Sequence, residues 1–211
     1  TAFGDLALGA LIASAFGGGN VWVAEGTFDD VSLPLYSGVY VCGGFQPDFV
    51  LEQRSIQDHP TVVNGPLNQN VVDVHHGNFG PAVLDGLTLV GDPDTSDGIG
   101  NLGHWMEVHS VAVESCKRGM KIVVASQTSV VVAGCSVSNS RLEGILADGP
   151  LDMLVDSSVF EANGNEGLAL QDLLAPESGS VSLSVRASVF RANGQEGLDC
   201  HLDVVPGSGP S

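Results

Sequence analysis

The residues best suited to chemistry are three carboxylates in a short stretch bounded by glycines. Asp92, Asp94 and Asp97 lie between Gly91 and Gly98 in the sequence GDPDTSDG. Oxygen ligands at such close spacing are typical of loops that bind a hard cation such as Ca²⁺. Asp97 stands where standard calcium loops prefer glycine, and no glutamate closes the loop at the expected spacing. The sequence therefore leaves two interpretations open, a calcium site and a solvated acidic loop.

A pair of histidines is the second candidate for metal binding. His75 and His76 are adjacent, and Asp73 lies in the same polar stretch, residues 73–78. Imidazole and carboxylate groups can ligate a transition metal. Neighbouring residues of a strand, however, point to opposite faces of its sheet and rarely share an ion. We expect a polar break here with solvent-exposed loop histidines.

Basic residues are scarce and gathered in one place. Lys117, Arg118 and Lys121 form a cluster in a chain with 7 basic and 25 acidic residues and a formal charge of −18. This charge argues against nucleic acid and anionic membranes as partners, because phosphate groups are bound by Lys and Arg. It also disfavours unaided binding of anionic polymers. An acidic surface equally suits plain solubility, or a saline or calcium-rich medium.

The elements that must position these residues repeat along the chain. The sequence SVFEANGNEGL at residues 158–168 returns as SVFRANGQEGL at residues 188–198, and looser copies begin at Cys135 and Ser110. Self-similarity at such a period indicates stacked supersecondary units. Alternating apolar residues separated by Asn, Gly and Ser favour short strands and tight bends. Each unit of roughly 21–30 residues is then one coil of a parallel β-solenoid rather than a hairpin.

The repeat predicts which residues lie above one another. Aligning Gly119, Gly144, Gly167 and Gly197 places equivalent residues about 4.8 Å apart in neighbouring coils. Inside the solenoid we expect a stack of Met120, Ile145, Leu168 and Leu198. At the bend we expect a ladder of Ser140, Asn163 and Asn193, and a bend column of Arg118, Glu143, Glu166 and Glu196. On the outside we expect two columns: the first is Lys121, Leu146, Ala169 and Asp199, and the second is Val123, Asp148, Gln171 and His201. We expect the ladder amides to bond to the backbone of the next coil.

The cysteines are too few and too scattered for a disulfide framework or a zinc site. They are Cys42, Cys116, Cys135 and Cys200, with no C-x-x-C spacing. We expect buried free thiols, because cysteine behaves as a small core hydrophobe. A disulfide between Cys116 and Cys135 in neighbouring coils stays open as the alternative.

The chain reads as one domain with a cap. Apolar residues from Leu6 to Phe16, ended by three glycines, predict a short helix that closes the open core of the first coil. Residues 1–19 are thus the cap, 20–105 irregular opening coils with a loop at 45–57, and 106–205 regular coils. No apolar run reaches membrane-spanning length. The abrupt start and the Pro/Gly-rich end lead us to expect a piece of a longer secreted chain.

The motif VFxANGxEGL resembles the repeats of right-handed parallel β-helix proteins, the pectate-lyase-like superfamily. The front half of the chain resembles the opening coils of secreted bacterial members of that superfamily, at residues 20–28, 38–45, 61–65 and 83–89. The resemblance implies an all-β fold, a right-handed single-stranded parallel β-helix with a short N-terminal capping helix. It also implies an extracellular or cell-surface location. It indicates no single activity, because the superfamily includes lyases, hydrolases, epimerases and adhesins.

The resemblance also implies where a site would lie. In pectate-lyase-like enzymes the outer face of a parallel sheet carries acidic residues that hold calcium, and an Arg or Lys abstracts the proton next to a uronate carboxyl. Here the catalytic candidates are Lys121, Asp148 and Glu143, although no motif of a known lyase or hydrolase accompanies them. The wider candidate binding surface comprises Arg118, Lys121, Glu143, Asp148, Glu166, Gln171, Glu196, Asp199 and His201.

Three functions remain open from the sequence. We expect a secreted or cell-surface scaffold or adhesin-like module that contacts a polysaccharide or surface glycan without catalysis. The alternative is a polysaccharide lyase, hydrolase or epimerase acting on the sheet face. The third is calcium-dependent assembly through Asp92, Asp94 and Asp97. A deep groove at Lys121 would favour the enzyme, and a flat surface the scaffold.

Overall fold

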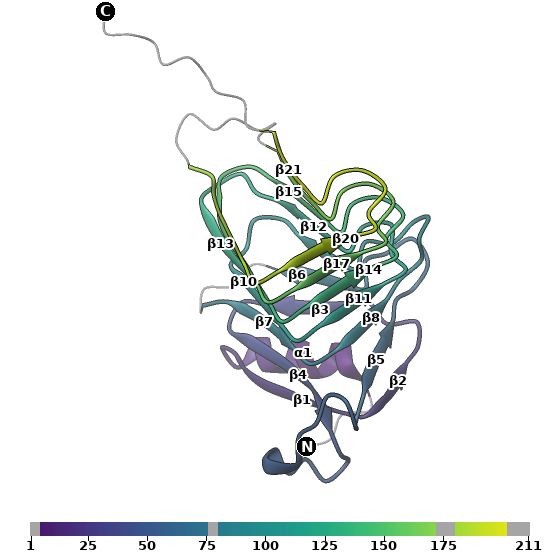
Figure 1. The fold of residues 1–211 in the computed structure, drawn as a ribbon. Coiled ribbons are helices and arrows are strands. Elements are labelled where there is room, and N and C mark those ends of the chain that lie inside the picture. Colours follow the sequence, from purple (N-terminus) through teal and green to yellow (C-terminus); the bar gives the residue numbers. More distant parts are fainter. Residues whose placement is uncertain (1–4, 76–79, 172–179, 202–211) are drawn as a thin grey trace, which may run out of the picture.

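The chain winds into a right-handed parallel β-helix, as the sequence predicts. The computed structural model describes residues 5–75, 80–171 and 180–201. Over these ranges, each coil contributes one strand to each of three parallel sheets, and every sheet contains seven described strands. Figure 1 shows the coils stacked in sequence order from the N-terminal to the C-terminal end.

The three sheets are named A, B and C in chain order. Sheet A consists of β1 (Gly19–Ala24), β4 (Val39–Phe45), β7 (Ala82–Asp85), β10 (Met106–His109), β13 (Thr128–Ala133), β16 (Leu151–Asp156) and β19 (Ser182–Arg186). Sheet B consists of β2 (Gly26–Phe28), β5 (Thr61–Asn64), β8 (Thr88–Val90), β11 (Ala112–Glu114), β14 (Ser136–Ser138), β17 (Val159–Glu161) and β20 (Val189–Arg191). Sheet C consists of β3 (Leu33–Tyr36), β6 (Val72–His75), β9 (Ile99–Asn101), β12 (Met120–Val123), β15 (Ile145–Asp148), β18 (Leu168–Gln171) and β21 (Leu198–His201).

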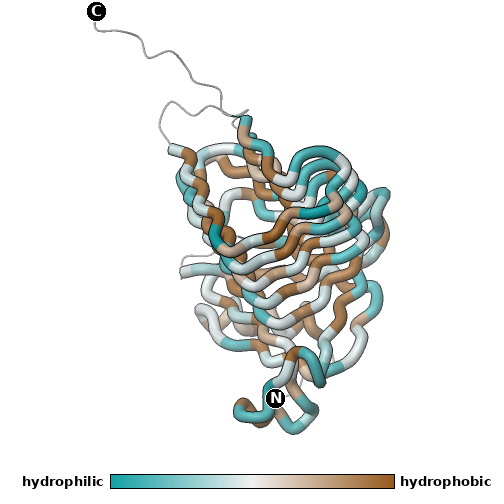
Figure 2. The backbone as a smooth tube through the Cα atoms, viewed as in Figure 1, coloured by the Kyte–Doolittle hydropathy of each residue, from teal (hydrophilic) through white to brown (hydrophobic). Residues whose placement is uncertain are grey.

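Alternation along each strand builds the core. Figure 2 shows apolar and polar residues alternating along the coils. Three members of the predicted inward stack, Met120, Ile145 and Leu168, are in register and fully buried. The fourth, Leu198, keeps the register but is 41% exposed on the last described strand. Higher up, the rings of Phe160 and Phe190 stack with centroids 4.8 Å apart. The apolar side chains therefore form one continuous column, the main source of stability in such a fold.

The predicted amide ladder at the bend between sheets B and C is also present. The Oδ1 atom of Asn163 accepts from the N–H of Ser140 at 3.1 Å, and its Nδ2 donates to the carbonyl of Val137 at 3.3 Å. One coil further on, Asn193 repeats the pattern with the N–H of Asn163 at 3.1 Å and the carbonyl of Phe160 at 3.2 Å. The amides of Asn163 and Asn193 are thus bonded to the neighbouring coil, whereas the buried Oγ atom of Ser140, the third member of the predicted ladder, has no hydrogen-bond partner among the described residues.

The bend glycines allow the backbones of neighbouring coils to approach closely, and they do not adopt an unusual φ. At Gly144, a Cβ atom would collide with the carbonyl oxygen of Gly167 in the next coil. The left-handed backbone conformation falls instead on four equivalent non-glycine residues earlier in the bend, with φ of 55° or 56°: Ser115, Asn139, Ala162 and Ala192. The sequence repeat locates the bend correctly but does not reveal which of its residues bears this conformation.

Helix α1 (Leu6–Ala15) lies across the first coil, where a cap is expected. The side chain of Asp5 accepts from the N–H of Leu8 at 3.1 Å and caps the helix N-terminus. Leu6 and Ala10 are buried in the core, and the helix packs against β3, β1 and β4. Within the described segments, no helix is long and apolar enough to cross a bilayer.

Two stretches expected to be irregular are strands. Asp73, Val74 and His75 belong to β6 rather than to a polar break, and Ile99–Asn101 forms β9. His75 is exposed, as expected, and its ring stacks on that of Tyr36 with centroids 5.2 Å apart. His76 lies outside the described residues. The expected loop after β4 is present and includes a short 3₁₀ helix, η1 (Leu51–Gln53).

All four cysteines are free thiols, but only two are buried. Burial raises the pKa of Cys116 to about 12 and that of Cys135 to about 11. Cys42 is half-buried because it lies on the outward phase of β4. Cys200 has the expected inward phase yet is exposed. It lies on β21, the last described strand, so no described coil stacks over it.

Candidate functional site

The predicted bend column exists and is held together by an ion-pair network. The Nε atom of Arg118 donates to Glu143 at 3.0 Å, and its Nη1 lies 3.5 Å from the carboxylate of Asp97. These three side chains are only 11–19% exposed. Glu166 and Glu196 follow in the same column, linked through backbone bonds at the bend. Arg118 thus braces three consecutive coils and offers little free charge to a ligand.

The catalytic candidates on sheet C are only partly brought together. Lys121 on β12 pairs in register with Leu146, and Asp148 pairs with Val123. Lys121 and Asp148 are therefore diagonal neighbours on one outward face, with expected Cβ separations of about 7–8 Å. Glu143 is engaged by Arg118, and its other oxygen accepts from Asn165 at 3.3 Å.

The remaining predicted binding residues lie where the repeat places them. Gln171 continues the outward row of Asp148, and it pairs with His201 on β21. Asp199 has the outward phase of β21. Ala169, expected to be a small surface residue, is buried at 1% exposure. These positions form rows on sheet C, without a cluster of reactive groups among them.

The acidic loop gives each carboxylate a different partner. Asp92 Oδ1 accepts from the side chain of Thr95 at 3.0 Å and from the N–H groups of Asp94 and Thr95 at 2.9 Å, and these bonds lower the pKa of its carboxyl. Asp94 binds Arg141 at 2.7 Å, and Asp97 faces the guanidinium described above. No group of three or more His, Cys, Asp or Glu side chains in the described ranges is arranged to hold a metal. Calcium at this loop stays a prediction.

The outer face of sheet A carries exposed aromatic rings. Trp22 on β1 and Tyr40 on β4 are 41% and 39% exposed, and Trp105 is 46% exposed. Trp105 directly precedes β10, and its carbonyl accepts from the N–H of Ala82 at 3.0 Å. It therefore continues the ladder on the outward phase of β10. Both tryptophans of the chain lie on this face.

Polar groups lie on the same strands as these rings and on β7 between them. One outward row crosses β1, β4, β7 and β10 and consists of Trp22, Cys42, Asp85 and His109. We call this region the aromatic face: Trp22, Tyr40, Cys42, Asp85, Trp105, Glu107 and His109. Tyr40 and Trp105 are separated by two strand spacings, or about 10 Å along the solenoid axis.

An arginine from the loop after β4 closes one side of the aromatic face. Arg54 donates to the carboxylate of Asp85 at 2.8 Å and to the carbonyl of Gly43 at 2.8 Å. Its guanidinium also lies 5.4 Å from the ring centroid of Phe45. The loop is thereby fixed against the second and third coils, so the aromatic face has a rigid border.

A histidine and a carboxylate lie side by side on β10, the last strand of the aromatic face. The Nε2 atom of His109 is 3.3 Å from Glu107, and the two side chains are 36% and 29% exposed. In register, His109 stands beside Asp85. The carboxylate of Glu107 orients the imidazole ring of His109.

The sequence contained a signal for this face. Trp22 and Tyr40 alternate with Val21, Val23, Val39 and Val41, which predicts outward aromatic residues on two buried strands. The pairing of β4 with β7 is hidden, because the loop after β4 separates Cys42 from its partner Asp85 in the sequence. Register therefore became visible only in the structure.

Neither a protein-family model nor a curated protein matches the chain. Among solved structures, the A-module of the mannuronan C-5 epimerase AlgE4 from Azotobacter vinelandii is similar, with 15% sequence identity and a TM-score of 0.38. The match covers 94% of this chain and 72% of that one.

Proposed function

We propose that the chain is an extracellular or cell-surface β-helix module that binds carbohydrate along the aromatic face without catalysis. One observation carries the proposal: Trp22, Tyr40 and Trp105 present half-exposed rings on a single sheet face, interspersed with hydrogen-bonding side chains. Aromatic rings pack against the C–H face of a sugar, and their polar edges and neighbours bond its hydroxyls. A rigid sheet holds these groups in a fixed arrangement at low entropic cost.

The charge of the protein favours a neutral polymer. The chain has a formal charge of −18, and Asp85 and Glu107 lie within the aromatic face itself. An anionic polymer would meet repulsion that Arg54, already paired with Asp85, does not offset. We therefore expect neutral polysaccharides to bind more tightly than uronic ones at low salt.

The proposal is tested by calorimetric titration with a panel of neutral and uronic polysaccharides. Tyr40→Ala and Trp105→Ala should each weaken binding about 5- to 30-fold, corresponding to about 1–2 kcal/mol of lost ring contact. Phe16→Ala is the matched control, because Phe16 is an 86% exposed aromatic residue outside the aromatic face. Equal weakening by all three substitutions, or no binding across the panel, would contradict the proposal.

A second function is favoured by the pair of His109 and Glu107. A histidine beside a carboxylate is suited to proton transfer, so a bound polymer would be a substrate for lyase, hydrolase or epimerase chemistry. His109→Gln should then abolish turnover and retain binding. If every polymer that binds is recovered unchanged after prolonged incubation, the catalytic function is contradicted and binding without catalysis remains.

Calcium-dependent stabilisation through Asp92, Asp94 and Asp97 is a separate proposal. A cation bound only by the folded state raises the melting temperature by mass action. In that case Ca²⁺ should raise the melting temperature, EDTA should reverse the shift, and Asp92→Asn should abolish it. A melting temperature that neither Ca²⁺ nor EDTA changes would contradict calcium binding by the folded protein.

A further inference from the structure

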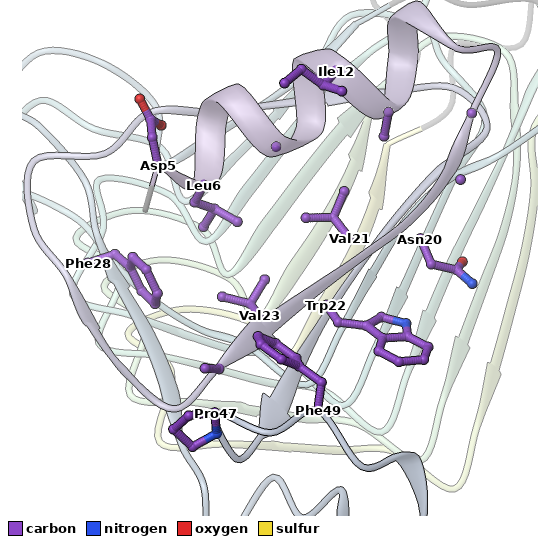
Figure 3. Close-up of a pocket in the computed structure, with 15 residues that line it drawn as sticks. Asp5, Leu6, Ile12, Asn20, Val21, Trp22, Val23, Phe28, Pro47 and Phe49 are labelled. Atoms are coloured by element: carbon purple, nitrogen blue, oxygen red, sulfur yellow. The ribbon is translucent and has the colours of Figure 1, made fainter. Parts of the chain in front are cut away.

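A second surface, which shares only Trp22 with the aromatic face, lies at the N-terminal end of the solenoid. Helix α1 covers only part of the first coil and leaves a cavity of about 730 Å³ between itself and β1 (Figure 3). Its walls are mainly apolar, formed by Leu6, Ile12, Val21, Val23, Phe28 and Phe49 among others. The volume lies in the range of ordinary ligand pockets, so the cavity is large enough to admit several side chains.

The cavity runs along the edge of β1 rather than over one face of it. Val21, Trp22 and Val23 all line it. Because successive side chains of a strand point to opposite faces, a space that touches all three must pass over the strand edge. Figure 3 shows Val21 and Val23 on the helix side of β1, and Trp22 with Phe49 on the other. We call this space the edge groove.

The backbone of β1 is unpaired at this edge. β1 ends sheet A, and β4 is its neighbour on the other side. Gly19 and Glu25 donate their N–H groups toward that side, to Gly38 at 2.9 Å and Phe45 at 2.7 Å. In a parallel ladder, alternate residues point the opposite way. The N–H and C=O groups of Asn20 and Trp22 therefore face the edge groove.

The two sides of the edge groove suit the alternating side chains of an extended chain. Leu6, Ile12 and Phe28 form an apolar wall on the core side. Pro47 and Phe49 form the outer wall, beside the ring of Trp22. A segment hydrogen-bonded to β1 would place one set of side chains against each wall. A compact small molecule would leave the row of backbone donors and acceptors unused.

One end of the edge groove is acidic. A second cavity of about 550 Å³ shares Asp5, Leu6 and Phe28 with the first and adds Asp29 and Asp30. Three exposed carboxylates at this end, on a strongly acidic protein, complement a cationic side chain.

We propose that the edge groove binds an extended peptide segment of a partner protein, which adds to sheet A as a strand beside β1. The segment is apolar or aromatic at successive positions and carries Lys or Arg at the end that meets Asp5, Asp29 and Asp30. Its main-chain hydrogen bonds supply affinity, and the two walls supply specificity. This function goes beyond carbohydrate binding on the aromatic face, and the two surfaces meet at Trp22.

The test uses a fluorescent eight-residue peptide in which valine and tyrosine alternate between terminal lysines. Fluorescence anisotropy should show saturable binding, weakened when the lysines are replaced by glutamates. N-methylation of one alternate set of peptide amides should weaken binding at least about tenfold, and methylation of the other set less than about twofold, because only one set faces β1. Equal sensitivity of both sets would overturn strand addition.

Two pairs of protein variants locate the peptide. Asn20→Pro removes an edge donor without touching the ladder to β4 and should abolish binding, whereas Asn20→Ala retains that donor and should bind normally. Phe49→Ala should weaken peptide binding several-fold and leave polysaccharide binding unchanged. Melting temperatures verify that each variant is folded, and the N-methylated peptides give the answer with unmodified protein.

Other occupants give distinct results. If the peptide binds only after deletion of residues 1–4, the edge groove belongs to the N-terminus of this chain and the proposal is wrong. Concentration-dependent dimers in sedimentation, abolished by Asn20→Pro, would assign it to a second copy and equally overturn the proposal.

Discussion

The aromatic face of sheet A and the bend that leads into sheet C use polar residues in opposite ways. At the bend, Arg118, Asp97 and Glu143 are 11–19% exposed and paired with one another, and Asn163 is buried with its amide satisfied. On the aromatic face, ring surfaces are 39–46% exposed. Charged and amide groups at the bend hold coils together, whereas the aromatic face leaves contact area for a ligand.

The largest effect is expected at the amide ladder. Asn163→Ala removes hydrogen bonds to Ser140, Val137 and Asn193 and leaves buried polar groups without partners. We expect the free energy of unfolding to fall by about 2–5 kcal/mol, measured by urea denaturation. Gln195→Ala, at an exposed position of the same bend, should change it by less than about 0.5 kcal/mol. A loss of polysaccharide affinity in folded Asn163→Ala protein would break the division between the two regions.

The ion-pair network should come next. Arg118→Met leaves the carboxylates of Asp97 and Glu143 close together without their cation, so unfolding should become easier by about 1–3 kcal/mol, less than for a fully buried pair. Arg191→Met is the control, because its pair with Glu161 is well exposed. That change should leave the free energy of unfolding essentially unaltered, because solvent screens the pair. Equal effects of the two substitutions would show that the bend column is an ordinary surface.

These two predictions concern the part of the molecule that the sequence described best. The spacing between Leu168 and Leu198 and their flanking repeats was sufficient to predict register, inward stack and ladder, because each coil is bonded to a near copy of itself. Pairing of Tyr40 with Val83 could not be predicted in this way. The intervening insertions have no counterpart elsewhere, so the position of each opening strand depends on tertiary packing.

The candidate site shows the same limit. The internal repeat placed Lys121 and Asp148 on one outward face of sheet C correctly, but it did not show that Glu143 stays at the bend, engaged by Arg118. Residue types suggested calcium at Asp92, Asp94 and Asp97, whereas their side-chain directions depend on Thr95, Arg141 and Arg118. Hydrogen-bond competition of this kind is a property of three-dimensional geometry, which composition and spacing do not contain.

Thiol reactivity should separate the regions by pH and by ligand. Buried Cys116 and Cys135, with pKa values of about 12 and 11, have thiolate fractions of about one in a thousand or less at pH 8, so they should resist alkylation until unfolding. Cys200 should react fastest and Cys42 more slowly. Raising the pH from 7 to 9 should accelerate both, because the thiolate is the nucleophile.

Bound polysaccharide should slow the alkylation of Cys42 and leave the alkylation rate of Cys200 unchanged, as measured by mass spectrometry of alkylated peptides. Cys42 belongs to the aromatic face, whereas Cys200 lies at the far end of the solenoid. Protection of Cys200 alone would place the ligand on sheet C or beyond it.

The smallest effect is expected for the candidates on sheet C. Lys121→Ala and Asp148→Ala should change polysaccharide affinity by less than about twofold, since neither side chain belongs to the aromatic face. Titration of the same polymers used for Tyr40→Ala provides the comparison. A tenfold loss at Lys121 with none at Tyr40 would reverse the assignment of the two regions.

The most direct measurement is the tryptophan emission of the unmodified protein during titration with a binding polysaccharide. Trp22 and Trp105 are its only tryptophans, and both lie half-exposed on the aromatic face. We predict a blue shift and reduced quenching by acrylamide, with the same midpoint as calorimetry, and a smaller change in Trp105→Ala. Calorimetric binding with unchanged emission and quenching would contradict the central claim that carbohydrate binds to sheet A.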